Sequence, residues 1–263
     1  MEKDLLLKDY LVSRLISFGK TVDGYCKIYY KTNEDLVDSM LDIDFQDKDV
    51  LTVLASGDHV FTSRLLEARK TDAFDFNRLS IYYFYLRIWS MEYREELYPK
   101  IMDGDNRWLA SLLKMVRPRN EQEQQALDFF RKHIKEDTEM NKLFFDVYSQ
   151  PDGKTLYRSA AELKDCLNPE LDYYPLDLFR EFYHSTTYDI ILISNILEWA
   201  RNDPKKLTIA HDNLSRLTKK DGIVVCSSLI DRPKKSMEME KEIFSDSFTF
   251  EKTGSTYTYI KKK

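Results

Sequence analysis

The segment Val50–Asn77 constrains the fold most, because it reads as a strand, a tight turn, a helix and a second strand in close succession. Val50–Val53 is a short apolar run of β-forming residues, which is typical of a strand buried on both faces. Ala55–Asp58 then interrupts the run with small and turn-forming residues. Apolar residues recur at helical spacing from Val60 to Leu66, and Thr71–Phe76 reads as the second strand. The segment therefore predicts an alternating α/β fold.

An acidic residue near the end of the second predicted strand gives this segment a functional meaning. A nucleotide is bound well where a helix N-terminus offers amide N–H groups and a nearby carboxylate accepts hydrogen bonds from ribose hydroxyls. Asp75 stands where that carboxylate is needed, and Asn77 is close enough in sequence to support it. The alternative is an ordinary aspartate in an exposed turn. We favour a nucleotide site with Asp75 as its ribose anchor.

Composition limits the class of protein. Charged residues make up 32% and hydrophobic residues 43% of the 263 residues, which is typical of a globular chain. The net charge is −5 and the pI is about 5.6. Because neutralising phosphates requires a basic surface, this balance argues against a nucleic-acid partner. Seven glycines are too few for most phosphate-loop motifs.

Cysteine usage and apolar runs indicate where the protein works. The three cysteines are far apart and form no CxxC pair, so we expect neither a disulfide framework nor a bound metal. The N-terminus is acidic and does not resemble a signal peptide. The most apolar run, Ile190–Leu197, is too short to span a bilayer. We predict a cytoplasmic protein without a transmembrane segment.

Three regions are expected along the chain. Residues 1–45 form an N-terminal helical cap, with helices at 2–18 and at Leu36–Leu41 and a tyrosine-rich connection that includes Tyr30. This connection is either a packing segment or a cover whose tyrosine rings face a ligand. Residues 46–91 and 142–263 form the nucleotide-binding domain. The charged stretch 92–141 is expected to be a helical insertion on the substrate side.

The remaining secondary structure completes a seven-stranded pattern. An aromatic helix is expected to run to about Met91, and further helices are expected around 176–183 and 207–217. Additional strands are expected at 154–158, 188–193 and 223–229. Phe248–Lys252 and Thr256–Ile260 flank Gly254 and predict a closing β-hairpin. We therefore expect a Rossmann-like sheet of seven strands, the last antiparallel, with helices on both faces.

A sheet of seven strands that ends in a hairpin resembles the class I S-adenosylmethionine-dependent methyltransferases. The segments YYKTNED, VLTVLASGDHV, DAFDFN and ISNILEW look more closely like the family that transfers a 3-amino-3-carboxypropyl group from S-adenosylmethionine to diacylglycerol in betaine-lipid synthesis. The resemblance covers about 29–89 and 189–229. It implies S-adenosylmethionine as cofactor and a small-molecule or lipid-like acceptor.

The resemblance also implies roles for individual residues. Backbone at Ala55, Ser56 and Gly57 is expected near the amino-acid portion of the cofactor, although the methyltransferase pattern has two or three glycines in this turn and only Gly57 is present. Asp58 is expected either to contact the cofactor ammonium group or to cap the next helix. His59 reads as a general base or, more often for a lone histidine at a helix start, as a structural residue.

The other expected site residues follow the later strands. Ala160 and Glu162 stand where this fold usually contacts adenine, after the predicted third strand. Ser194 and Asn195 end the fourth strand, where the sulfonium and the acceptor meet, and are our candidates for catalysis. Glu198 and Trp199 lie one turn further on and are expected to line the acceptor pocket.

Three functions remain open at this point. The first is an S-adenosylmethionine-dependent transferase of methyl or aminocarboxypropyl groups. The second is a non-catalytic scaffold on a degenerate methyltransferase fold, which the single glycine of the turn favours and Asp75, Ser194 and Asn195 oppose. The third is a nicotinamide-dependent oxidoreductase, which normally has the fuller GxGxxG turn and lacks the closing hairpin.

Overall fold

The computed structural model describes residues 34–102, 108–134, 155, 157, 161–166, 171–200, 202–227, 234–253 and 256–262. The predicted helix at 2–18 and the residue Tyr30 lie outside the described residues. The predicted helix at Leu36–Leu41 is confirmed as α2, Leu36–Met40.

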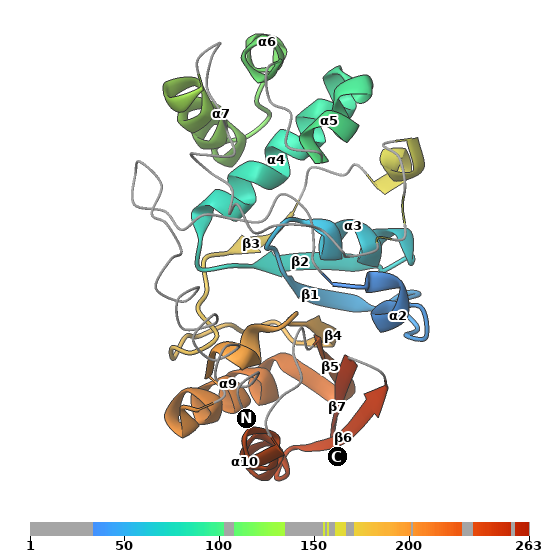
Figure 1. Ribbon diagram of the computed structural model, residues 1–263, viewed down its shortest axis with the longest axis vertical. Helices are drawn as coiled ribbons and strands as arrows, with labels where there is room; N and C mark the ends of the chain where they lie inside the picture. The colour runs from blue at the N-terminus through green and yellow to red at the C-terminus, as the bar shows by residue number, and fades with distance from the viewer. Residues whose placement is uncertain are drawn as a thin grey trace, which may run out of the picture.

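A seven-stranded sheet in the order β3-β2-β1-β4-β5-β7-β6 forms the centre of the described structure (Figure 1). The first five strands pair in parallel, whereas β7 is antiparallel to both β5 and β6. This confirms the expected Rossmann-like methyltransferase sheet with its antiparallel last strand. The strands are β1 Asp49–Val53, β2 Lys70–Phe74, β3 Tyr173–Tyr174, β4 Tyr188–Leu192, β5 Thr218–Ser227, β6 Phe248–Thr253 and β7 Thr256–Lys261.

Helices cover both faces of the sheet, as expected from a central strand that is apolar on both sides (Figure 1). Val50 of β1 packs in one cluster with α2, whereas Leu51 and Val53 pack in another cluster with α9. In Figure 1, α3 and α4 lie on one side of the sheet and α9 and α10 on the other. These helices are α3 Asp58–Leu65, α4 Arg78–Tyr93, α9 Pro204–Leu217 and α10 Lys234–Phe244.

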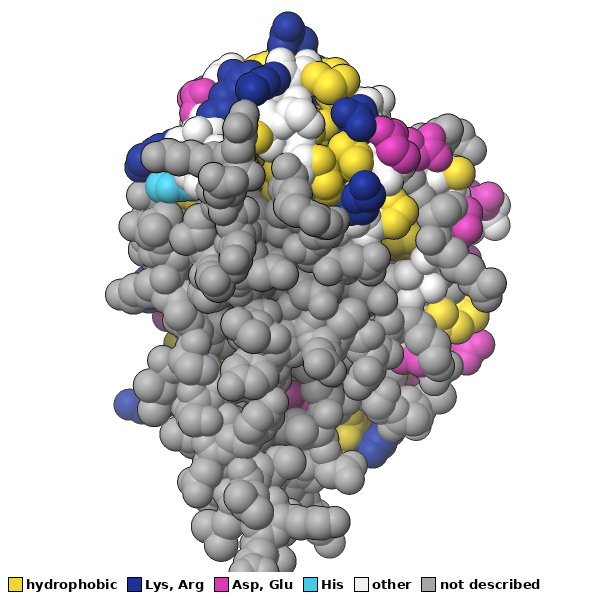
Figure 2. Space-filling model, turned by 45° about the horizontal axis from the view of Figure 1, so that its top comes forward, with side chains coloured by type: hydrophobic (Ala, Val, Ile, Leu, Met, Phe, Trp, Pro, Cys, Tyr) yellow, Lys and Arg dark blue, Asp and Glu magenta, His cyan; other side chains and the backbone are white. Residues whose placement is uncertain are grey.

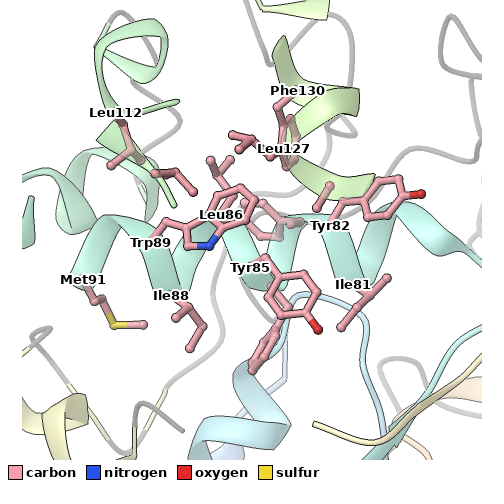
Figure 3. Packing of buried hydrophobic residues seen from close by; sticks show 14 of the residues in the cluster. Ile81, Tyr82, Tyr85, Leu86, Ile88, Trp89, Met91, Leu112, Leu127 and Phe130 are labelled. Atoms are coloured by element: carbon pink, nitrogen blue, oxygen red, sulfur yellow. The ribbon is translucent and has the colours of Figure 1, made fainter. Parts of the chain in front are cut away.

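Helix α4 is buried all round, because further helices cover the side that faces away from the sheet. Every residue from Leu79 to Met91 is buried, as its aromatic sequence indicated. Figure 3 shows Leu86 and Trp89 of α4 beside Leu112 of α6 and Leu127 of α7. The covering layer consists of η1 Glu95–Leu97, α5 Tyr98–Met102, α6 Leu109–Met115 and α7 Glu121–His133. The described part of the stretch 92–141 is thus helical and shares one core with α4.

Two predicted elements differ from the structure, and one helix of the structure was not predicted. The third strand of the sheet is Tyr173–Tyr174, which pairs with Ala73 and Phe74 of β2. The predicted strand at 154–158 falls mostly outside the described residues, and neither of its two described members, Thr155 and Tyr157, lies in a strand. The predicted helix at 176–183 is wrong, since that segment is irregular with a single turn at Leu178–Phe179. Helix α10 was not predicted; its apolar residues pack against α9 and the hairpin.

A charged cluster ties together the amino ends of the central strands, at the sheet edge opposite to the loops that follow them. Asp49 of β1 accepts from Arg69 Nη2 at 2.5 Å and from Lys219 Nζ at 2.8 Å. Lys219 of β5 also donates to Asp189 Oδ2 of β4 at 2.9 Å, and the same oxygen accepts from the backbone N–H of Asp49. The hydrogen bonds from Arg69 and Lys219 lower the pKa of Asp49 from 3.8 to about 2.

We predict that Asp49→Asn lowers the free energy of unfolding by up to about 2 kcal/mol at pH 7, since each pKa unit is worth about 1.4 kcal/mol. The pKa is depressed in the folded state, so this stability is present above pH 3.8 and is lost as the pH falls toward 2. Urea unfolding at pH 7 and at pH 3 should show that the variant and the native protein differ less in free energy of unfolding at the lower pH. A difference that is equal at both pH values would contradict this assignment. Asp246→Asn, on the exposed turn after α10, is the control.

Lys and Arg side chains surround a few hydrophobic ones on the α5–α7 end of the molecule (Figure 2). Met115 at the end of α6 is 40% exposed there.

No helix among the described residues is long and apolar enough to cross a membrane. The same residues contain no group of histidine, cysteine and acidic side chains arranged to hold a metal ion.

Candidate functional site

The candidate site lies at the carboxyl ends of β2, β1 and β4, which meet at one edge of the sheet because the three strands are parallel. The chain moves from β1 to β2 and β3 on one side, and continues with β4 and β5 on the other. The connections therefore reverse direction between β1 and β4. In open α/β sheets, ligands bind at such a switch point.

Asp75 directly follows β2 and points its carboxylate at the end of β1. Its Oδ2 accepts from the backbone N–H of Ala55 at 3.0 Å, and its Oδ1 accepts from that of Asn77 at 2.9 Å. Burial raises the pKa of this carboxyl group, and the hydrogen bonds from Asn77, Ser80 and Ala55 oppose that rise. A carboxylate has about four acceptor sites, so with Asn77, Ser80 and Ala55 as donors the group retains capacity for one more.

Asn77 takes part in this arrangement through its backbone, while its side chain begins the next helix. Its Oδ1 accepts from the N–H of Leu79 at 3.3 Å as the N-cap of α4. Between the two polar residues, Phe76 is 64% exposed. A large apolar ring so exposed beside a carboxylate is suited to a ligand with a flat apolar part next to hydroxyl groups.

The turn after β1 holds two residues in the left-handed region of backbone conformation. Ala55 has a φ of 43° and Gly57 a φ of 89°. The glycine is required, since a Cβ there would also lie 3.0 Å from Cδ2 of Phe84. Ala55 carries a Cβ and still has a positive φ, so its backbone is strained, as that of residues at functional sites often is.

Asp58 does not have either of its two expected roles. Gly57 is the N-cap of α3 without a side-chain cap, so the expectation that Asp58 caps this helix is wrong. Its carboxylate is fully buried and accepts from Arg87 Nη2 at 2.8 Å, from Ser56 Oγ at 2.7 Å and from the hydroxyl of Tyr157. Burial opposes ionisation, yet Arg87 and the two hydroxyls hold the pKa of Asp58 below its ordinary value. No oxygen is exposed for a cofactor ammonium group.

A second buried carboxylate lies beneath the end of β4. Glu34, just before α2, accepts from the hydroxyl of Ser194, and its Oε2 lies 3.2 Å from Nε2 of His59. Burial disfavours the charge on Glu34, but His59 and the hydroxyls of Ser194 and Ser227 hold its pKa below the ordinary value. Ser194 has a φ of 53°, so the ends of both β1 and β4 carry a strained non-glycine residue.

The other residues expected after β4 lie at the same edge. Asn195 is half-buried, and its Oδ1 accepts from Ser194 Oγ at 3.3 Å. Glu198 and Trp199 follow on η3, Ile196–Ala200, where Glu198 is half-buried and Trp199 is 40% exposed. Ser194, Asn195, Glu198 and Trp199 thus lie at the same end of the sheet as Asp75.

The expected adenine contacts are not where the sequence placed them. Ala160 lies outside the described residues, as does Tyr30. Glu162 is exposed on η2, Ala161–Cys166, which packs against α3 and does not follow the third strand. Because β3 is Tyr173–Tyr174, the segment after the third strand begins at Pro175. The assignment of Ala160 and Glu162 to that position is therefore wrong.

Three residues of the site were not recognised from the sequence. Glu34 gave no signal, since nothing in its neighbourhood marks it as a partner of residues far along the chain. Phe76 was read as the last residue of the second strand, but β2 ends at Phe74. Arg87 did give a signal: it is the only charged residue between Ile81 and Met91, and a lone charge in an apolar helix indicates a buried ion pair.

We predict that Ala55→Gly raises the free energy of unfolding by about 1 kcal/mol, because glycine adopts a positive φ without strain. The same change at Ala73, which is fully buried in the extended conformation of β2, is the matched control. It should lower stability by about 1 kcal/mol or more, through lost packing and greater freedom of the unfolded chain. Thermal and urea unfolding measure both. A destabilising Ala55→Gly would mean that this turn carries no strain.

No protein-family model matches the chain, and no curated protein matches it. Among solved structures, a methyltransferase from Pyrococcus furiosus has a TM-score of 0.43 and 8% identity, with 98% of each chain covered. The ribosomal protein L11 methylase from Lactobacillus delbrueckii subsp. bulgaricus has a TM-score of 0.39 and 12% identity, with 87% of this chain and 75% of that one covered. The N-methyltransferase NodS from Bradyrhizobium japonicum WM9, in complex with S-adenosyl-L-homocysteine, has a TM-score of 0.36 and 8% identity, with 82% and 78% covered. Since all three TM-scores are below 0.5, the fold assignment rests on strand order and pairing, and the function rests on the site.

Proposed function

We propose that this protein is an S-adenosylmethionine-dependent transferase that moves a methyl or a 3-amino-3-carboxypropyl group to an acceptor. The observation that carries the proposal is the carboxylate of Asp75, held at the switch point by the N–H groups of Ala55 and Asn77. Its remaining acceptor site suits a ribose hydroxyl of a nucleoside. The exposed ring of Phe76 beside it suits the adenine.

The turn after β1 fits the amino-acid portion of this cofactor. Gly57 has no side chain to keep a ligand from the backbone, and Ala55 and Ser56 are small. S-adenosylmethionine supplies a carbon bonded to a positively charged sulfur, which leaves as a neutral thioether when the carbon is attacked. The contribution of the protein to such a displacement is to position the donor and the acceptor.

The acceptor side of the reaction is assigned to the residues after β4. We place Ser194 and Asn195 at the point of transfer, with Glu198 and Trp199 lining the acceptor pocket. An oxygen or nitrogen acceptor must lose a proton, and His59 is the group suited to take it. With Nε2 directed at Glu34, the Nδ1 atom of His59 is buried and has no hydrogen-bond partner among the described residues.

The nucleoside product released from S-adenosylmethionine identifies the transferred group. The four segments that resemble the betaine-lipid family favour aminocarboxypropyl transfer, and the exposed rings of Phe76 and Trp199 favour an acceptor with apolar parts. Incubation with S-adenosylmethionine and a lipid-containing cell extract is therefore expected to release methylthioadenosine. Release of S-adenosylhomocysteine would assign methyl transfer instead.

Asp75→Ala should weaken cofactor binding. Calorimetry with S-adenosylhomocysteine is expected to detect binding to the native protein, and a loss of at least about tenfold in affinity for the variant, because a hydrogen bond to a charged group is removed. Asp246→Ala is the control for a change of charge alone. If native protein and Asp75→Ala bind equally, Asp75 is not the ribose anchor. If NADH rather than S-adenosylhomocysteine raises the melting temperature of the native protein, the fold serves an oxidoreductase.

Phe76→Ala is expected to weaken binding of S-adenosylhomocysteine about tenfold, since stacking of a base on an aromatic ring is worth about 1–3 kcal/mol. The melting temperature should change little, because the ring is mostly exposed. Tyr183→Ala removes another exposed ring, 88% accessible and located before β4, and should leave the affinity unchanged. Equal affinities of native protein and Phe76→Ala would place the base elsewhere.

A further inference from the structure

A buried polar cluster lies behind the turn that follows β1, on the side away from the proposed cofactor. Arg87 of α4 is its centre, and it is fully buried. Its Nη2 donates to Asp58 Oδ1 at 2.8 Å, to the hydroxyl of Tyr98 at 2.5 Å and to that of Tyr157 at 2.7 Å. Its Nη1 donates to the backbone carbonyl of Ser56 at 2.5 Å. Four separate segments of the chain thus meet at one guanidinium.

These contacts fix the backbone of the turn on both sides of its only glycine. Arg87 donates to the carbonyl of Ser56, just before Gly57, and to the side chain of Asp58, just after it. Ser56 Oγ in turn donates to Asp58 Oδ2 at 2.7 Å. A Cβ at Gly57 would lie 3.6 Å from Nη1 of Arg87, so the guanidinium packs directly against the turn. The centroid of the Phe61 ring lies 4.8 Å from Cζ of Arg87, within range of a cation–π interaction.

Stability alone does not explain this ion pair. Moving two charges into a protein interior costs about as much free energy as their attraction returns. Apolar pairs of similar size therefore often stabilise a fold equally well. What an apolar pair does not provide is a directed hydrogen bond to the carbonyl of Ser56. That bond holds the segment in which Ala55 has a φ of 43° and donates its N–H to Asp75.

We propose that Arg87 and Asp58 are positioning residues of the cofactor site: they hold the strained turn in the conformation that accepts the cofactor. This inference rests on the proposed function. Tyr98 begins α5, so the same cluster makes the shape of the turn depend on how the helical layer packs. The layer outside α4 therefore supports cofactor binding without contacting the cofactor.

The test compares affinity for S-adenosylhomocysteine with stability in the same variants. The double variant Asp58→Leu/Arg87→Met replaces the ion pair by an apolar pair, and it should remain folded while binding at least tenfold more weakly. Arg119→Met is the matched control, because it breaks a pair with Glu123, which is fully buried, in the helical layer but away from the turn. It should lower the melting temperature and leave the affinity within about twofold of native. Calorimetry at 15 °C and thermal unfolding give the two readouts.

Tyr157→Phe keeps the proposal testable if the double variant does not fold. It removes the one hydroxyl that contacts Asp58, Arg87 and Tyr98, and it leaves the ring in place. We expect threefold to tenfold weaker binding by a fully folded protein. If the native protein binds but neither the double variant nor Tyr157→Phe loses affinity, the positioning role is overturned while the proposed function stands. If the native protein does not bind at all, the proposed function fails and this inference fails with it.

Discussion

Parallel pairing of β1 with β2 on one side and β4 on the other is the constraint on which the site depends. It brings three loops that are far apart in sequence to a single edge: the turn at 54–58, the acid at 75 and the polar residues at 194–195. The hydrogen bond from Ala55 N–H to Asp75 then joins two of these loops directly. Ala55 and Ser194, both with positive φ, lie at this edge, and the opposite edge is held by the ion pairs around Asp49.

The helical layer follows from the composition of α4. A helix that is apolar on all sides cannot face water, so the sheet alone does not satisfy it. Helices α5, α6 and α7 cover its outer side and share its core. The one charge in the middle of this helix, on Arg87, is turned toward the strand–helix turn and neutralised by Asp58. The layer is therefore tied to the site by packing and by a specific ion pair at once.

The sequence predicted well wherever a local pattern is strong. The first strand, its turn, the acid after the second strand, the fourth strand and the hairpin were found from apolar runs and turn residues. The third strand was missed because Tyr173–Tyr174 is too short to show a periodicity and is defined by its pairing with β2. Asp58 was read as a cap or a ligand contact because its partner, Arg87, lies on another helix. Glu34 accepts a hydrogen bond from Ser194, which is far away in the sequence. The residues around either one give no sign of such a contact.

The central claim is that Asp75, Phe76 and the turn at 54–58 form one site for S-adenosylmethionine. A crystal structure of the protein with S-adenosylhomocysteine tests it most directly. We expect a ribose hydroxyl within hydrogen-bonding distance of the Asp75 carboxylate and the adenine against Phe76. The amino-acid portion should lie along Ala55–Gly57, with Asp58 still paired to Arg87. A nucleoside bound at another edge of the sheet, or Asp58 released from Arg87 to hold the ligand, would contradict the account.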